Sequence, residues 1–242
     1  MAQPANRDAR MVEGSNTEAA GRRAGLAYLV IIVFPSAAYL TLSSLLAGDS
    51  YVVLARLAAN QTVFMLAFAA NVIGFTVWVV LGVLLYRLMG STGRIAGVLM
   101  LIFIAAGTAM SFIALAPLLP LLSAASSGMD AGKLGPMVQN YNRLLLLSQV
   151  FSGLWLFPLG WLILRSRVVP RLLGACLIVG GVSYLLNFAT AFEPGLNHMV
   201  AYQIAYTATG ILGVFVGEFG LCLWLLLKGA REPYLLAIRG SR

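Results

Sequence analysis

The sequence predicts an all-α fold, a polytopic bundle of six transmembrane helices with both termini in the cytoplasm. Of its 242 residues, 60% are hydrophobic and 10% are charged, whereas a soluble domain is about half apolar and about a quarter charged. The mean hydropathy is +0.90. The apolar residues gather in long runs, and a membrane-spanning helix needs about 20 of them. This pattern excludes a soluble enzyme, a disordered protein and a nucleic-acid-binding module.

The apolar runs define the expected spans and tails. Residues 1–23 are polar and are expected to form a disordered cytoplasmic tail, and residues 229–242 a basic cytoplasmic tail. The first run is too long for a cleavable signal core, so we interpret it as a retained anchor. The six spans are expected at residues 24–47, 61–88, 94–125, 139–165, 170–191 and 199–228. The runs are too long, and alternate too little, for β-strands.

Prolines and loops divide the spans further. Pro117 and Pro120 are expected to end the third helix, and Pro158 to kink the fourth, because proline removes a backbone hydrogen bond. Pro170 stands at a favourable first-turn position of the fifth helix. The outer loop at residues 126–138 is expected to be the most flexible.

The distribution of basic residues predicts the orientation. Of the 16 lysines and arginines, those in the two tails and in the turns after the second and fourth spans lie on one side. Only Arg56, Lys133 and Arg143 lie on the other. Basic loops stay on the cytoplasmic side and meet anionic lipids there. Both termini are therefore expected in the cytoplasm, with membrane lipids as partners and no nucleic acid.

Glu218 is the principal candidate for a functional site. It lies ten residues before Lys228, which is about 15 Å along a helix and therefore near mid-bilayer. A carboxyl group at this depth is costly and usually faces the protein. At about 100° per residue, Glu218 shares one helix face with several small or polar residues: Gln203, Thr207, Gly210, Val214 and Gly217. The alternative is a protonated carboxyl group that only joins two helices by a hydrogen bond.

Other polar residues of the spans lie mostly in the outer halves. We interpret them as a polar cavity that opens outward and narrows toward Glu218. The expected ligand-binding residues are Glu218, Gln203, Thr207, Tyr206, Gln149, Asn187, Asn71 and Arg143. Two alternatives stay open: the amides only hold helices together, and Arg143 extends to the outer lipid headgroups.

Glycines, cysteines and histidine give further constraints. Gly213 and Gly217 are four residues apart in the sixth span, a spacing that allows close helix contact. Packing within the chain explains them, and a homodimer through glycine-rich faces stays open. Cys176 and Cys222 lie in apolar segments, and His198 is the only histidine. No metal-ligand spacing or phosphate-binding loop occurs, so neither a metal nor a cofactor is expected.

Four short segments resemble a family of bacterial small membrane proteins, domain-of-unknown-function family 4386. The segments are Arg23–Leu29, Val83–Leu88, Leu164–Gly174 and Gly217–Gly229. The likeness covers about residues 22–230, nearly the whole membrane domain. It implies a multi-pass protein of the bacterial inner membrane and no particular activity. Glu218 falls in the last of these segments.

Three functions are compatible with the sequence. The first is the binding or movement of a small amphipathic molecule or lipid in the cavity around Glu218. The second is an intramembrane enzyme with Glu218 as general acid toward a hydrophobic substrate, which makes Glu218 the one candidate catalytic residue. The third is a structural or partner protein without a ligand.

Overall fold

A computed structural model describes residues 4–123, 130–166 and 168–230 of the chain. Among these residues the regular structure is helical, and six helices are long and apolar enough to cross a membrane. The prediction of an all-α bundle of six membrane-spanning helices is therefore confirmed. The side of the membrane on which the termini lie stays a prediction.

Among the described residues, ten helical elements build the six spans, and two further elements lie between spans. The first three spans are α1 (Pro4–Leu45), α3 (Gln61–Met89), and α4 (Arg94–Leu115) with the 3₁₀ turn η1 (Ala116–Ser123). The fourth is α6 (Ala131–Leu154) with α7 (Leu156–Ser166), and the fifth is α8 (Arg171–Ala189). The sixth is α9 (Val200–Gly210), η3 (Ile211–Phe219) and α10 (Gly220–Lys228). The short elements α2 (Ser50–Ala59) and η2 (Pro194–His198) lie between spans.

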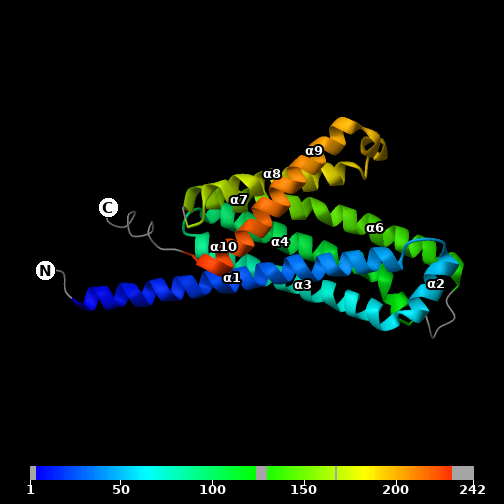
Figure 1. Cartoon of the computed structure of the whole chain (residues 1–242), viewed down its shortest axis with the longest axis horizontal. Coiled ribbons are helices and arrows are strands. Elements are labelled where there is room, and N and C mark those ends of the chain that lie inside the picture. The colour runs from blue at the N-terminus through cyan, green and yellow to red at the C-terminus, as the bar shows by residue number, and fades with distance from the viewer. Residues whose placement is uncertain (1–3, 124–129, 167, 231–242) are drawn as a thin grey trace.

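The helices run roughly along one axis, and α1 begins at the end of the bundle where α10 finishes (Figure 1). The α3–α4 and α7–α8 turns lie at this same end, whereas α2 and η2 lie at the opposite end. The helix α1 packs against α3 and α10, and α8 packs against α6, α7 and η3. The helix α9 extends away from the rest of the bundle (Figure 1), packs on α8, η2 and η3, and contains no buried residue.

The helix α1 begins before the first expected span, in the segment for which the sequence predicts a disordered tail. The helix begins at Pro4 and continues without a break into the first apolar span, which starts at Thr17. Helix formation is limited by nucleation, whereas extending an existing helix fixes one residue for each new hydrogen bond. The segment before the span contains Ala5 and Ala9, and alanine has the highest helix propensity. Residues 4–16 can therefore continue the helix of the span without a separate nucleation step.

The fourth span also begins earlier than expected. The helix α6 starts at Ala131, so much of the loop expected at 126–138 is helical, and residues 126–129 lie outside the described residues. The side chain of Asp130 caps this helix by accepting a hydrogen bond from the backbone N–H of Gly132 at 3.0 Å. The span breaks at Trp155, between α6 and α7. This break fits the expected effect of Pro158, which has no N–H for the carbonyl of Leu154.

The short helix α2 has no counterpart among the sequence predictions. Its Arg56 donates hydrogen bonds from Nη1 to the carbonyls of Ser44 at 2.5 Å and Ala47 at 2.9 Å. The last carbonyls of a helix have no partner within the helix. Arg56 therefore caps the end of α1 and fixes α2 against it.

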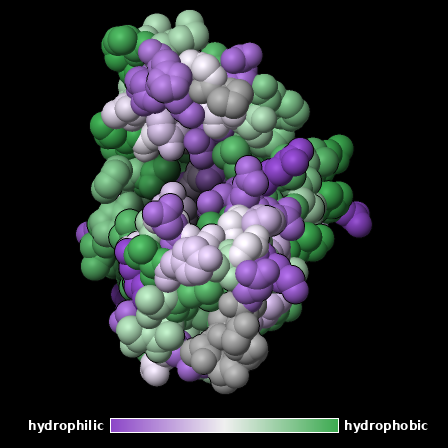
Figure 2. All heavy atoms as spheres, turned by 90° about the vertical axis from the view of Figure 1, so that its right-hand side faces the viewer, coloured by the Kyte–Doolittle hydropathy of each residue, from purple (hydrophilic) through white to green (hydrophobic). Residues whose placement is uncertain are grey.

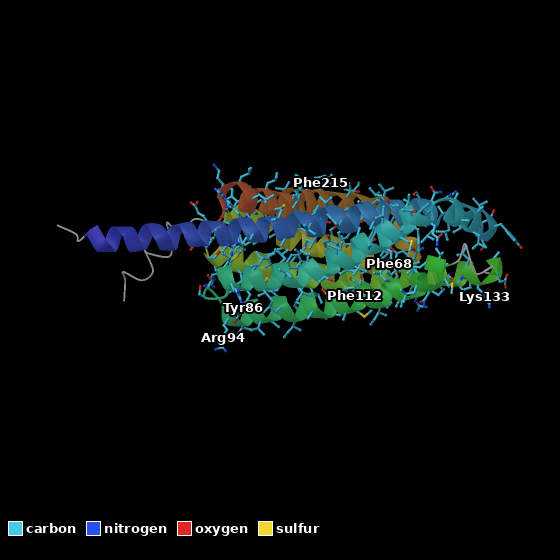
Figure 3. All side chains as sticks on the ribbon, turned by 90° about the horizontal axis from the view of Figure 1, so that it is seen from below. Phe68, Tyr86, Arg94, Phe112, Lys133 and Phe215 are labelled. Atoms are coloured by element: carbon cyan, nitrogen blue, oxygen red, sulfur yellow. The ribbon has the colours of Figure 1, made fainter. Side chains whose placement is uncertain are left out.

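The outer surface of the spans is apolar. Large exposed side chains include Phe215 at 70% and Phe112 at 38% exposure, and Figure 3 shows both, with Phe68, along the length of the spans. Arg94 lies at one end of the bundle and Lys133 at the other (Figure 3). This distribution fits a protein surrounded by lipid at its middle and by water at its ends.

Candidate functional site

Glu218 lies in a stretch of π-helix. The segment η3 has this wider turn over Ile211–Phe219, and its buried residues are Gly213, Gly217 and Glu218. A π-helix bonds residue i to residue i+5, is rare, and is frequent at functional sites. The Glu218 side chain therefore projects from the helix in a different direction from the one that a regular α-helix would give it.

Glycines bring η3 against the backbone of α8. A Cβ atom on Gly213 would overlap the backbone of Gly180, and a Cβ on Gly217 would lie 3.0 Å from the backbone nitrogen of Leu177. Gly181 lies against the backbone of Gly153 in α6 in the same manner. The glycine faces on which the homodimer alternative rested thus pack on one another within the chain.

The carboxyl group of Glu218 joins two other helices. Its side chain is buried, with 7% exposure. Oε1 accepts a hydrogen bond from the hydroxyl of Tyr184 in α8 at 3.0 Å, and Oε2 accepts one from the hydroxyl of Tyr28 in α1 at 3.4 Å. The carboxyl group therefore lies inside the bundle and holds α1, α8 and η3 together.

Aromatic rings continue from this group into the bundle. Tyr28 and Trp155 have ring centroids 6.1 Å apart, and Trp155 meets Trp78 edge to face at 5.8 Å. The indole nitrogen of Trp78 is buried and has no hydrogen-bond partner among the described residues. The carboxyl group thus lies at one end of a row of aromatic rings formed by Tyr28, Trp155 and Trp78.

A pocket of about 470 Å³ lies against Glu218. This volume falls in the range of small-molecule sites, about 300–1,000 Å³. The polar groups of its lining come from six helical elements, and apolar and aromatic residues form most of the rest. The polar and aromatic lining residues are Ser36, Tyr39, Asn71, Phe75, Trp78, Ser111, Tyr141, Ser148, Gln149, Ser152, Trp155, Tyr184 and Glu218.

A second pocket of about 460 Å³ adjoins the first. The two share Tyr39, Tyr141, Leu145 and Gln149, and the second extends along α1 to Ala47. It therefore leads from the Glu218 pocket toward the end of the bundle that holds α2 and η2. The view of this end is hollowed near its centre, with hydrophilic residues around the hollow (Figure 2).

Three of the amides predicted from the sequence lie at these two pockets. Asn71 is buried, lines the first pocket and donates from Nδ2 to the carbonyl of Ala67 at 3.4 Å. Gln149 lines both pockets, and its Oε1 accepts a hydrogen bond from Nδ2 of Asn187 at 2.5 Å. Asn187 lines the second pocket.

The structure does not bring the other four predicted residues to either pocket. Gln203 is exposed and donates to the carbonyl of Asn197 at 2.9 Å, Thr207 is exposed, and Tyr206 is half-buried. These three lie in α9, and the π-helix between α9 and Glu218 breaks the 100° spacing on which the helix wheel depended. Arg143 is exposed on α6 and lines neither pocket.

Sequence reasoning missed the partners of Glu218. Tyr28 and Tyr184 are 190 and 34 residues away from it in the chain, so no local spacing links them. A usable signal does exist for Tyr184, which precedes Asn187 by three residues and therefore lies near it on α8. Among the described residues, no group of three or more His, Cys, Asp or Glu side chains gathers in a way that could hold a metal ion.

Comparison with known proteins places the chain in a family. It is 27% identical over 85 residues to an uncharacterized protein of Archaeoglobus fulgidus, a match that covers 35% of this chain and 46% of that protein. The chain thus spans about half the length of this relative. No solved structure matches. The family described as "Domain of unknown function (DUF4386)" matches residues 23–229, which include Tyr28, Tyr184 and Glu218. The chain therefore belongs to the DUF4386 family.

Proposed function

We propose that this multi-pass membrane protein binds or moves a small amphipathic molecule or lipid in the pocket beside Glu218. The observation that carries the proposal is the pocket itself. Within one space of about 470 Å³, it brings together the buried carboxyl group of Glu218, its hydrogen-bond partner Tyr184 and the rings of Trp78 and Trp155. An amphipathic molecule presents both kinds of surface, polar at its head and apolar along its body.

The composition of the lining favours binding over catalysis. Glu218 is the one carboxyl group among the described lining residues, which include no His, Lys, Arg or Cys. General acid–base catalysis commonly needs a second group that exchanges protons with the substrate. A single acid with two tyrosine partners suits recognition better than the alternative of an intramembrane enzyme with Glu218 as general acid.

The pocket also distinguishes binding from a purely structural role. A carboxyl group that only joins helices has no need of adjoining open space, and interiors are otherwise closely packed. Here the carboxyl group that joins α1, α8 and η3 also borders the pocket. The lining polar groups, including Asn71 and Gln149, are then available to orient the head of a ligand.

We place the protein in the bacterial inner membrane with both termini in the cytoplasm. The bundle end at which α10 finishes carries Arg87, Arg94, Arg165, Arg171 and Lys228. Basic residues mark the cytoplasmic side. The two adjoining pockets extend toward the other end, so the cavity opens outward in this orientation.

Native mass spectrometry of the protein purified in detergent tests the proposal. We expect the wild-type protein to retain a small molecule. Ser152→Phe places a bulky ring in the pocket lining and should abolish retention, whereas Thr76→Phe adds the same ring on an exposed surface of α3 and should not. Equal retention by the two variants, or a wild-type protein without any bound molecule, would contradict the proposal.

A further inference from the structure

The charges around the pocket select one class of ligand. Its described lining contains one ionisable carboxyl group and no basic side chain. An anionic head would therefore find no counter-ion, and burying an unpaired charge is costly. A cationic head would find Glu218 as its counter-ion.

The aromatic rings of the pocket favour the same class. Trp78 and Trp155 both line the pocket, and Tyr184 joins them beside Glu218. Organic cations bind to the faces of such rings, and most strongly where water is excluded. Trp78 is 7% and Trp155 2% exposed, so both rings lie in such an environment.

The pocket also reaches the lipid-facing side of α1. Leu40 lines it and is 67% exposed, and Tyr39 lines it and is 55% exposed. A molecule dissolved in the bilayer can therefore approach the pocket along this side of α1, which suits a lipophilic ligand.

We propose that the pocket binds lipophilic organic cations in exchange for a proton. This inference rests on the proposed function and narrows it to one ligand class. In the empty site, Glu218 is a neutral carboxylic acid, because a lone buried charge is costly. When the cation enters, the O–H bond of Glu218 breaks, the proton leaves to water, and the carboxylate pairs with the cation. The net charge of the site stays the same, because one positive charge enters with the cation and one leaves with the proton.

The groups around Glu218 are compatible with this exchange. Tyr28 from α1 and Tyr184 from α8 donate to its oxygens and stabilise the carboxylate. From α10, Cys222 faces the same side and donates to the carbonyl of Gly25 at 3.6 Å, and Cys176 of α8 contacts Gly217 through its backbone. None of these groups carries a positive charge that would keep the carboxyl group ionised in the empty site.

Isothermal titration calorimetry in detergent tests this inference with two probes of similar shape. Tetraphenylphosphonium is a cation, and triphenylphosphine oxide is neutral. We expect the wild-type protein to bind the cation about tenfold more tightly or better. Titrations in two buffers of different ionisation enthalpy should show the release of about one proton per cation. The oxide should bind without proton release.

Matched variants identify the group that releases the proton. Glu218→Gln should lose both the preference for the cation and the proton release, and keep its affinity for the oxide, which also shows that the variant is folded. Glu193→Gln changes an exposed acid that borders neither pocket and should behave as wild type. If Glu218→Gln does not fold, the wild-type titration is the test: release of about one proton per bound cation supports the inference, and its absence contradicts it.

The outcomes separate this inference from the proposed function. If the wild-type protein binds both probes equally and releases no proton, the cation inference is wrong, whereas the binding function stands. If the folded wild-type protein binds neither probe, the cation inference is wrong as well, and the mass spectrometry of retained molecules then decides the binding function separately.

Discussion

The contact between Gly213 and Gly180 gives the sharpest test of the structure. A Cβ atom at position 213 would overlap the Cα and the backbone nitrogen of Gly180. Neither of these atoms can move by a side-chain rotation, so η3 and α8 must separate. Overpacking of this kind costs about 1–3 kcal/mol. Gly213→Ala should therefore destabilise the protein, although alanine is the better helix former.

Gly210→Ala is the matched control, because it makes the same change one turn earlier in the same span. The nearest atom to its new Cβ is Oγ of Ser183 at 3.3 Å, which a small movement of the serine accommodates. Both variants gain the same helix propensity, so the overpacking alone separates them. At roughly 2–4 °C per kcal/mol for a chain of this size, the two melting temperatures should differ by about 2–12 °C.

Thermal unfolding followed by intrinsic fluorescence in detergent measures this difference. The reciprocal variant Gly180→Ala should lower the melting temperature as Gly213→Ala does, since it adds a methyl group on the other side of the same contact. If Gly213→Ala melts at or above the temperature of Gly210→Ala, then η3 does not pack on α8 as described, and the placement of Glu218 beside Tyr184 loses its support.

Four other predictions concern the site, a helix end and the orientation. Glu218→Gln should melt close to wild type because it keeps hydrogen-bonding atoms, whereas Glu218→Leu should lower the melting temperature clearly; equal losses would argue against the described bonds. Tyr184→Phe should lower the free energy of unfolding by about 1 kcal/mol. Tyr28→Phe should lower it less, because the hydrogen bond of Tyr28 to Glu218 is longer than that of Tyr184, 3.4 Å against 3.0 Å. Thermal unfolding of the two variants compares these losses. Arg56→Ala should increase hydrogen exchange at the end of α1, since it removes the cap on those carbonyls; unchanged exchange would exclude that role. In a bacterial host, green fluorescent protein fused to the C-terminus should fluoresce and alkaline phosphatase fused there should be inactive; the reverse pattern would invert the orientation.

The spans were predictable because each is a continuous run of apolar residues that can be recognised from the order of residues alone. The second span was expected at 61–88 and is the helix Gln61–Met89, and the sixth was expected at 199–228 and runs over Val200–Lys228. Length and apolarity suffice for this, since helices are the structures that satisfy their own backbone in lipid. The extension of α1 to Pro4 lacks an apolar signal and was missed for that reason.

The site was only partly predictable, for two physical reasons. Glu218 and Asn71 could be found because a polar residue in an apolar span is conspicuous. Gln203 and Thr207 were assigned to the same face as Glu218, and the π-helix of η3 removes that relation without a mark in the sequence. The pairing of Glu218 with Tyr28 depends on how α1 and η3 meet in three dimensions, which composition and local spacing do not encode.

The two halves of the sixth span differ in how closely they pack against the other helices. In its second half, the glycines of η3 lie against the backbone of α8, and α10 packs on α1. The first half, α9, contains no buried residue, so little protein fixes its position. The tilt of such a segment follows the thickness and composition of the bilayer. Packing within the protein thus fixes the position of η3 and α10, whereas the tilt of α9 depends on the surrounding lipids.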